Sequence, residues 1–193
     1  IISRELDETA IPPQQLPIVK RVIHTTADFD YAENLYFSAT AVADGLAALR
    51  RGAQIVTDTR MAQAGVNKAA LAKLGGEVHC FMADADIAEE ARKQGITRAA
   101  LSMEKACALP QPLIVVVGNA PTALLRLAEL IEEGRIAPAL IIGVPVGFVN
   151  VVESKEILLE SGLPCIVARG RKGGSTVAAA ICNALIYEAP KTC

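Results

Sequence analysis

The sequence has 193 residues, of which 52% are hydrophobic and 21% are charged, and this composition excludes an intrinsically disordered chain. Its formal net charge is −2, with no Trp, three Tyr and four Phe, so the basic surface and stacking aromatics of a generic nucleic-acid binder are missing. Five widely spaced cysteines without a CxxC pair favour free thiols in a reducing cytoplasm over disulfides or a zinc site. Pro and Gly interrupt the longest uncharged stretches, which argues against a membrane span. At roughly 150 residues per domain, residues 1–193 are expected to form a single domain.

Short β-branched runs alternate with longer amphipathic runs along the chain. The predicted strands are 18–23, 54–57, 77–82, 113–117, 139–143 and 165–168. The predicted helices are 32–51, 67–74, 86–95 with Asp86 as N-cap, 97–109, 121–133, 149–160 and 175–187 with Ser175 as cap. Strands separated by helices need crossover connections, so the predicted fold is α/β, a Rossmann-like three-layer sandwich with a mostly parallel central sheet and helices on both faces.

Ligands of such folds bind beyond the carboxyl ends of the strands, and this rule selects the loops that follow them. These candidate loops begin at His24, Asp58, Ala83, Gly118, Gly143 and Gly170. His24 closes the first predicted strand, and because histidine titrates near neutral pH it is a candidate for proton transfer. The alternative for His24 is a hydrogen-bonded structural histidine. His79 lies inside a predicted strand and is expected to be a histidine of the core or the sheet face.

Two glycine-containing turns, 118–122 and 170–176, each open a predicted helix directly after a strand. Free amides and the helix dipole make both turns candidate anion sites, and the alternative is an ordinary strand-to-helix turn. Neither turn matches the dinucleotide fingerprint, and Lys172 precedes the glycine pair instead of following it as in a P-loop. Arg60, Lys68 and Arg98 lie in or just after loops, where they either bind carboxylates or remain solvated surface charges. No spacing typical of metal ligands is present, so no metal is expected.

Six sequence blocks point to a family. They are 22–29 (VIHTTADF), 57–61 with 64–68 (TDTRM, AGVNK), 95–98 (GITR), 118–123 (GNAPTA), 143–150 with 153–155 (GVPVGFVN, ESK) and 170–175 (GRKGGS). On these blocks the chain resembles the precorrin-8 methylmutase family of cobalamin biosynthesis, including its cobalt-precorrin form. The resemblance implies an isomerase that moves a methyl group from C-11 to C-12 of a carboxylated tetrapyrrole by a 1,5-sigmatropic shift, to give hydrogenobyrinate or cobyrinate. It also implies a homodimer with active sites near the subunit interface and no redox cofactor.

The resemblance implies roles for individual residues. The family's histidine that donates and accepts a proton falls on His24, its GITR arginine on Arg98, and the polar residue of its AGV stretch on Asn67, the last two as substrate contacts. The complete set expected to bind substrate is Thr25, Thr59, Arg60, Asn67, Lys68, Arg98, Asn119, Thr122, Lys172, Gly173, Gly174 and Ser175. Family chains usually carry Ser-Phe just upstream of the Ile-Ile that opens this sequence, so an N-terminal segment with one further implied contact is expected to be missing here.

Two other functions fit the residues. One is a Rossmann-like enzyme that acts on a phosphorylated or nucleotide ligand, which the missing dinucleotide fingerprint disfavours. The other is a non-catalytic tetrapyrrole carrier, which needs no titratable side chain at the ligand. A cytoplasmic location without membrane or nucleic-acid partners is expected in each case.

Overall fold

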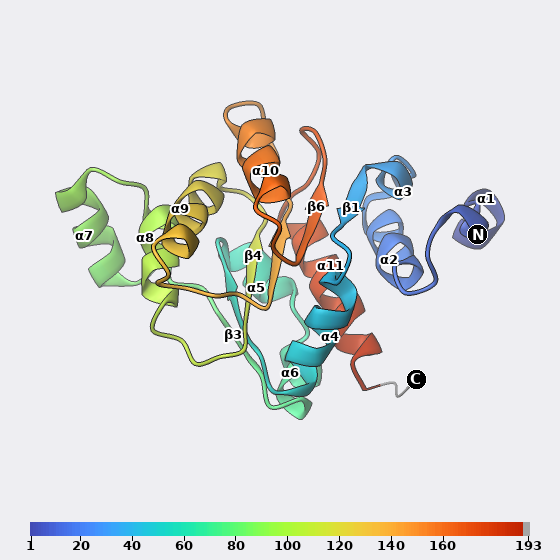
Figure 1. Cartoon of the computed structure of the whole chain (residues 1–193), viewed down its shortest axis with the longest axis horizontal. Coiled ribbons are helices and arrows are strands. Elements are labelled where there is room, and N and C mark those ends of the chain that lie inside the picture. The colour runs from blue at the N-terminus through green and yellow to red at the C-terminus, as the bar shows by residue number, and fades with distance from the viewer. Residues whose placement is uncertain (191–193) are drawn as a thin grey trace.

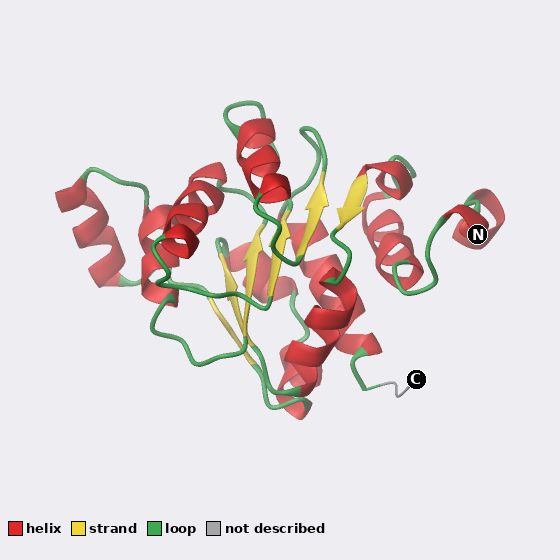
Figure 2. Ribbon diagram, in the orientation of Figure 1, coloured by secondary structure: helices red, strands yellow, loops and turns green. Residues whose placement is uncertain are grey.

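The computed structural model describes residues 1–190, and six strands form its central sheet. The strands are β1 (Leu35–Phe37), β2 (Gln54–Thr57), β3 (Glu77–His79), β4 (Leu113–Val117), β5 (Leu140–Gly143) and β6 (Cys165–Ala168). Their order in the sheet is β1-β6-β5-β4-β2-β3. The pairs among β2 to β6 are parallel, whereas the short edge strand β1 runs antiparallel to β6 (Figure 2). The predicted mostly parallel sheet is therefore confirmed.

Helices cover both faces of the sheet, as predicted (Figure 1). The helices are α1 (Ile2–Glu5), α2 (Leu16–Thr26), α3 (Tyr31–Asn34), α4 (Ala41–Arg50), α5 (Arg60–Gly65), α6 (Lys68–Lys73), α7 (Ala85–Gln94), α8 (Arg98–Ala106), α9 (Pro121–Glu132), α10 (Val151–Glu160) and α11 (Ser175–Glu188), with a 3-10 turn at Glu8–Ala10. Side chains of α2, α4, α5, α6 and α11 share one apolar core with one face of the sheet, and those of α8, α9 and α10 share a second core with the other face. Among residues 1–190, no helix has both the length and the apolarity to cross a bilayer.

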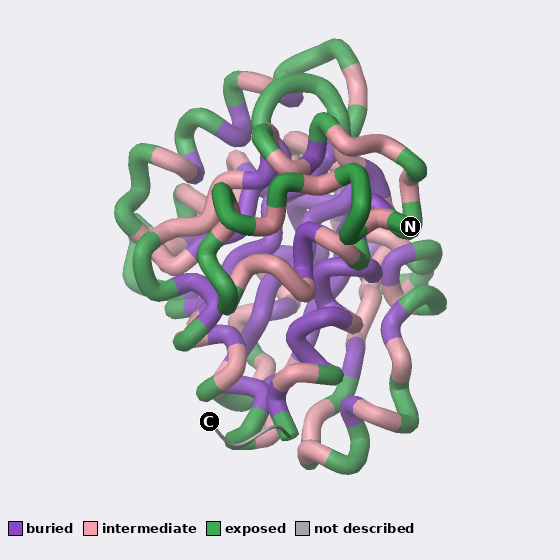
Figure 3. Tube along the Cα trace, turned by 90° about the vertical axis from the view of Figure 1, so that its right-hand side faces the viewer, coloured by how far each residue is buried: buried purple, intermediate pink, exposed green. Residues whose placement is uncertain are grey.

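Strand β4 lies between the two cores, and all five of its residues are buried. Ile114 and Val116 contribute to the core beneath α11, whereas Leu113, Val115 and Val117 contribute to the core beneath α9. Successive side chains of a strand point to opposite faces, so an uninterrupted apolar run suits a strand covered on both sides. Burial of each such side chain contributes roughly 1.5–3 kcal/mol to folding. Figure 3 shows this buried interior beneath exposed loops.

The prediction of a strand over 18–23 is wrong, because these residues belong to helix α2. Ile18, Val19, Val22 and Ile23 are the buried residues of α2, and their spacing of one, four and five places them on one helical face against the core. The β-branched composition of the segment is therefore outweighed by its helical period. As a consequence, His24 lies in the last turn of a helix and does not close a strand.

Several other boundaries also differ from the prediction. The predicted helix 32–51 is interrupted by β1, and α4 begins only at Ala41. The N-cap of α7 is Asp84 and not the predicted Asp86, and the N-cap of α11 is Gly174 and not the predicted Ser175. Neither helix has a side-chain capping hydrogen bond from its N-cap residue. Strand β3 ends at His79 and not at residue 82. By contrast, the predicted strands 54–57, 113–117 and 165–168 coincide with β2, β4 and β6.

The four described cysteines, Cys80, Cys107, Cys165 and Cys182, are free, which agrees with the prediction of unpaired thiols. Burial raises the pKa of the Cys182 thiol to about 12, so this thiol stays protonated at neutral pH. Cys193 lies outside the described residues.

Candidate active site

A buried carboxylate occupies the point where the strand order reverses, between β2 and β4. Asp58 directly follows β2, and its carboxylate accepts hydrogen bonds from the backbone N–H groups of Gly118 (2.8 Å), Asn119 (2.8 Å) and Ala120 (2.7 Å). Burial raises the pKa of the Asp58 carboxyl, and these three hydrogen bonds oppose the rise. The prediction of a free anion site at 118–122 is therefore wrong, because the amides already hold an anion of the protein itself. From the sequence, Asp58 is recognisable only as the first residue of a candidate loop, and its role as a buried acceptor is not.

A buried lysine that sequence reasoning missed holds the second glycine turn, which follows β6. Lys155 of α10 is fully buried, and its Nζ donates hydrogen bonds to the carbonyl oxygens of Gly170 (2.8 Å) and Lys172 (2.9 Å). Desolvation lowers the pKa of Lys155 to about 8. The N–H of Gly174 also donates to the Val144 carbonyl at 2.8 Å, which joins the turn to the loop after β5. The sequence feature that could have revealed Lys155 is its position on the apolar face of the predicted helix 149–160.

The exposed side chain of Lys172 links this turn to the segment that follows α2. Its Nζ lies 2.6 Å from Oδ2 of Asp28 and 2.6 Å from Oδ2 of Asp30. These hydrogen bonds raise the pKa of Lys172, and the bond from Lys172 lowers the pKa of Asp28. Lys172 therefore already shares its charge with two aspartates of the protein. Its role as a partner of substrate carboxylates stays a prediction.

Two hydroxyl pairs bring other predicted site residues together. The hydroxyl oxygens of Thr59 and Ser175 lie 2.7 Å apart, which connects the loop after β2 to the start of α11. Thr59 also caps α5, because its hydroxyl accepts the N–H of Ala62. In the same way, the hydroxyl of Thr122 lies 2.9 Å from that of Thr97, the residue that caps α8 immediately before the exposed Arg98. The GITR and GNAPTA blocks therefore meet in space.

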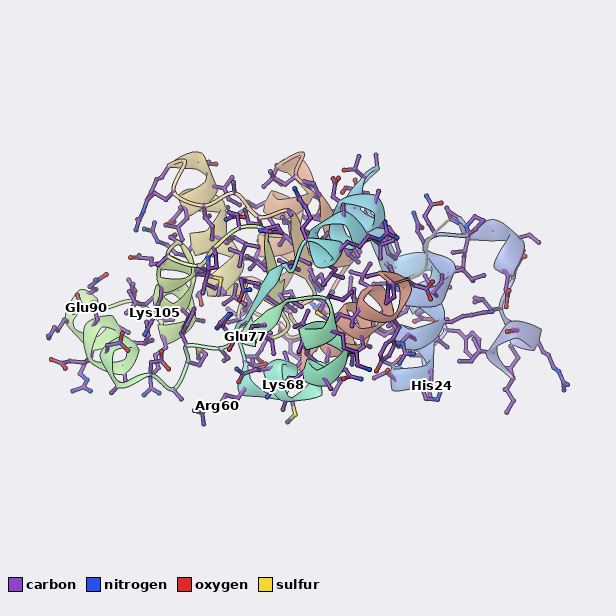
Figure 4. The ribbon with its side chains drawn as sticks, turned by 90° about the horizontal axis from the view of Figure 1, so that it is seen from below. His24, Arg60, Lys68, Glu77, Glu90 and Lys105 are labelled. Atoms are coloured by element: carbon purple, nitrogen blue, oxygen red, sulfur yellow. The ribbon has the colours of Figure 1, made fainter. Side chains whose placement is uncertain are left out.

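Asn67 takes part in a network between α6 and α11. Its side-chain oxygen caps α6, and its Nδ2 donates to the Tyr187 hydroxyl at 2.8 Å. Its backbone N–H donates to Oδ1 of Asn183, also at 2.8 Å. Exposed Arg60 and Lys68 begin α5 and α6 nearby along the chain, and Figure 4 shows both on the same edge of the molecule as His24.

His24 is exposed and lines a surface hollow of about 580 Å³. The other residues of this hollow are Ile1, Ile2, Ser3, Pro17, Lys20 and Arg21. Thr25 lines a second hollow of about 430 Å³, which reaches Met61 of α5 and Thr176 of α11. Since Thr176 follows Ser175, the end of α2 lies beside the carboxyl edge of the sheet even though His24 is not on a strand. The imidazole therefore has open space for a large ligand.

The remaining histidine behaves as predicted. His79 is half-buried on β3, and its Nε2 lies 2.7 Å from Oε1 of Gln54 on the neighbouring strand. It is therefore a hydrogen-bonded sheet-face histidine. Within residues 1–190, no three His, Cys, Asp or Glu side chains come together as a metal site.

A mostly parallel sheet between two helical layers, with polar loops at the carboxyl ends of its parallel strands, defines a Rossmann-like α/β protein. The family model of CbiC, Precorrin-8X methylmutase, matches residues 1–188. The chain is 46% identical to a Cobalt-precorrin-8 methylmutase of Priestia megaterium over 185 residues, 96% of this chain and 82% of that protein. A Salmonella typhimurium protein of the same name is 49% identical over 177 residues, 91% of this chain and 82% of that one.

A solved structure supports the same relationship. The precorrin-8X methylmutase of Thermus thermophilus superposes with a TM-score of 0.85 at 44% identity, covering 97% of this chain and 94% of that one. The chain belongs to the precorrin-8X methylmutase family, and it is accordingly an isomerase of cobalamin biosynthesis.

Proposed function

We propose that this chain moves the C-11 methyl group of a precorrin-8 macrocycle, metal-free or cobalt-containing, to C-12 by a 1,5-sigmatropic shift, with His24 as proton donor and acceptor. The observation that carries the role of His24 is its exposed imidazole on an open hollow, in contrast to the hydrogen-bonded His79. In the shift, the bond from the methyl carbon to C-11 breaks as the bond to C-12 forms, and the conjugated double bonds rearrange. The proton lent by His24 returns to it, so no other reactant is consumed.

The chemistry needs a general acid and a rigid site more than it needs a nucleophile. A methyl group migrates more readily over a π-system that protonation has made electron-poor, and a positioned general acid typically accelerates a reaction about 10²–10⁴-fold. Further acceleration would come from holding the macrocycle in a reactive shape. The loops that Asp58 and Lys155 fix by buried hydrogen bonds supply rigid surroundings for this purpose.

The substrate carries acetate and propionate groups, and the exposed cations among the predicted site residues suit them. Arg60 and Lys68 lie on the same edge of the molecule as His24 (Figure 4). Arg98 lies at the start of α8, where the preceding Thr97 meets Thr122 after β4. Guanidinium and ammonium groups bind carboxylates locally even in a chain whose formal net charge is −2. The other predicted contacts are hydroxyl, amide and glycine positions around the same loops.

We also propose a cytoplasmic homodimer with the site near the subunit interface. Large apolar side chains are exposed close to the site loops, with Phe148 82%, Val149 76% and Met61 66% accessible. Surfaces of this kind commonly mark interaction sites. Light scattering after size exclusion measures the mass, and a fully active monomer would contradict this part of the proposal.

The test of His24 compares His24→Ala with His79→Gln, because the chain has only these two histidines. We expect His24→Ala to retain its circular dichroism and its tetrapyrrole binding while losing about 10²–10⁴-fold in turnover, and His79→Gln to keep its rate. Methyl migration changes the conjugation, so the absorption spectrum reports turnover. A wild-type rate in His24→Ala would remove the assigned role of this residue.

The same assay separates an isomerase from a carrier, and it identifies the substrate. Wild-type protein incubated with metal-free and with cobalt-containing precorrin-8 should convert at least one of them. A carrier would return both unchanged, however tightly it binds them.

A further inference from the structure

Arg21 occupies a special position beside His24. It lies three residues earlier on α2, so the two side chains project from neighbouring positions about 4.5 Å apart along the helix axis. His24 lines the hollow of about 580 Å³ and Thr25 lines the hollow of about 430 Å³, whereas Arg21 lines both. A ligand that spans the two hollows therefore passes over the guanidinium of Arg21.

The guanidinium of Arg21 is held in place by an aromatic ring. Its central carbon lies 4.8 Å from the centroid of Tyr187 on α11, a typical cation–π distance. The Tyr187 hydroxyl in turn accepts the hydrogen bond from Asn67, so the ring that contacts Arg21 is itself held in place. A stacked guanidinium loses less conformational freedom when it binds a ligand than a free arginine would.

The charge of Arg21 is not neutralised by the protein. Within residues 1–190, Lys172, Lys105 and Arg126 each form ion pairs with at least two carboxylates, but no salt bridge there includes Arg21. Among residues 1–190, the guanidinium of Arg21 contacts the Tyr187 ring but donates no side-chain hydrogen bond to another residue, so its N–H groups are available to a ligand. A planar N–H edge matches the two oxygens of a carboxylate.

We infer that Arg21 binds a peripheral carboxylate of the tetrapyrrole and thereby sets which edge of the macrocycle faces His24. The inference rests on the proposed function of this site, since it takes its ligand from there. An anchor about one helical turn from the proton donor would hold the macrocycle edge that carries this carboxylate beside His24. Arg21 is on this account a binding residue that determines orientation, and the proton transfer remains with His24.

The experiment measures binding without turnover. The probe is cobyrinic acid, a corrin with free peripheral carboxylates, titrated into the full chain and followed by visible absorption. Arg21→Gln should weaken its binding about tenfold or more, and Arg21→Lys should recover part of the loss, because a lysine keeps the charge but not the planar edge. Arg92→Gln is the matched control, because Arg92 is an exposed arginine on α7 at the far end of the molecule (Figure 1).

Two further readouts separate carboxylate binding from a structural role. A corrin with amidated carboxylates should bind wild-type and Arg21→Gln equally, and added salt should weaken wild-type binding more than that of the variant. Tyr187→Leu, which leaves Arg21 intact but removes its support, should weaken binding by a smaller factor than Arg21→Gln. Circular dichroism confirms that each variant is folded.

Each outcome bears on one of the two proposals. Equal binding of cobyrinic acid by wild-type and Arg21→Gln would overturn the role of Arg21, even in a chain that isomerises precorrin-8. Weaker binding by Arg21→Gln supports that role even if wild-type protein fails to turn over, a result that would instead overturn the methyl shift. A wild-type chain that does not bind the probe would overturn both.

Discussion

Replacement of Lys155 by methionine should remove a specific dependence of stability on pH. Lys155 is fully buried beneath the glycine turn, and desolvation lowers its pKa from 10.5 to about 8. Below about pH 8 the lysine is protonated in both the folded and the unfolded chain. Between about pH 8 and 10.5 the folded chain releases a proton that the unfolded chain still holds, so the free energy of unfolding rises with pH.

The magnitude follows from the difference between the two pKa values. At 1.36 kcal/mol per pKa unit, the shift from 10.5 to about 8 corresponds to about 3 kcal/mol between neutral pH and pH 10.5. Other groups that titrate in this range are common to both proteins and cancel in the difference. The free energy of unfolding of wild-type protein, minus that of Lys155→Met, should therefore increase by about 3 kcal/mol over this range.

The assay is urea unfolding followed by far-ultraviolet circular dichroism at a series of pH values. Lys93→Met is the matched control for replacing a lysine as such, because Lys93 is an exposed lysine of α7. Parallel curves for wild-type and Lys155→Met would refute the reasoning, since they would show that Lys155 titrates alike in the folded and unfolded chains.

Two other predictions concern the same edge of the sheet. Asp58→Asn should lower the free energy of unfolding by about 3 kcal/mol in the urea assay. An amide group cannot accept all three backbone hydrogen bonds, and it turns its own N–H donors toward the backbone N–H groups. A change under about 0.5 kcal/mol would contradict this account. Gly173→Ala should lower the free energy of unfolding by at least about 2 kcal/mol more than Gly170→Ala does. A Cβ at Gly173 would collide with the Val144 carbonyl, whereas a Cβ at Gly170 meets nothing within 4 Å. Equal losses of stability in the two variants would show that the turn can move.

The sequence predicts the sheet interior well because its residues carry a local signal. The apolar runs of β4 and β6 are strands buried on both faces, and their ends coincide with the predicted ones. The segment 18–23 was predicted wrongly because β-branched residues suggest a strand, although its spacing is helical. Strand β1 has only three residues and takes its identity from antiparallel pairing with β6, which no local pattern contains.

The candidate site, like the fold, is predictable from the sequence only in part. The blocks that carry His24, Arg98 and Asn67 are visible in the sequence. The structure places the Arg98 block beside the loop after β4 and Asn67 against the last turn of α11. The contacts of Asp58 and Lys155 span 62 and 17 residues of sequence at their widest, so only the folded chain reveals them. For the same reason, the sequence leaves both a free anion site and an ordinary turn open for 118–122, and only the hydrogen bonds to Asp58 exclude the free anion site.

The carboxylate of Asp58 has a consequence for the ligands that this fold can accept. In nucleotide-binding relatives of the architecture, a phosphate lies at the helix N-terminus next to the reversal of strand order. Here a covalently attached anion fills that place, and a nucleotide would have to expel it from three amides at once. The Asp58 carboxylate thereby joins the end of β2 to the loop that follows β4, and the three amides that would meet a phosphate are already engaged.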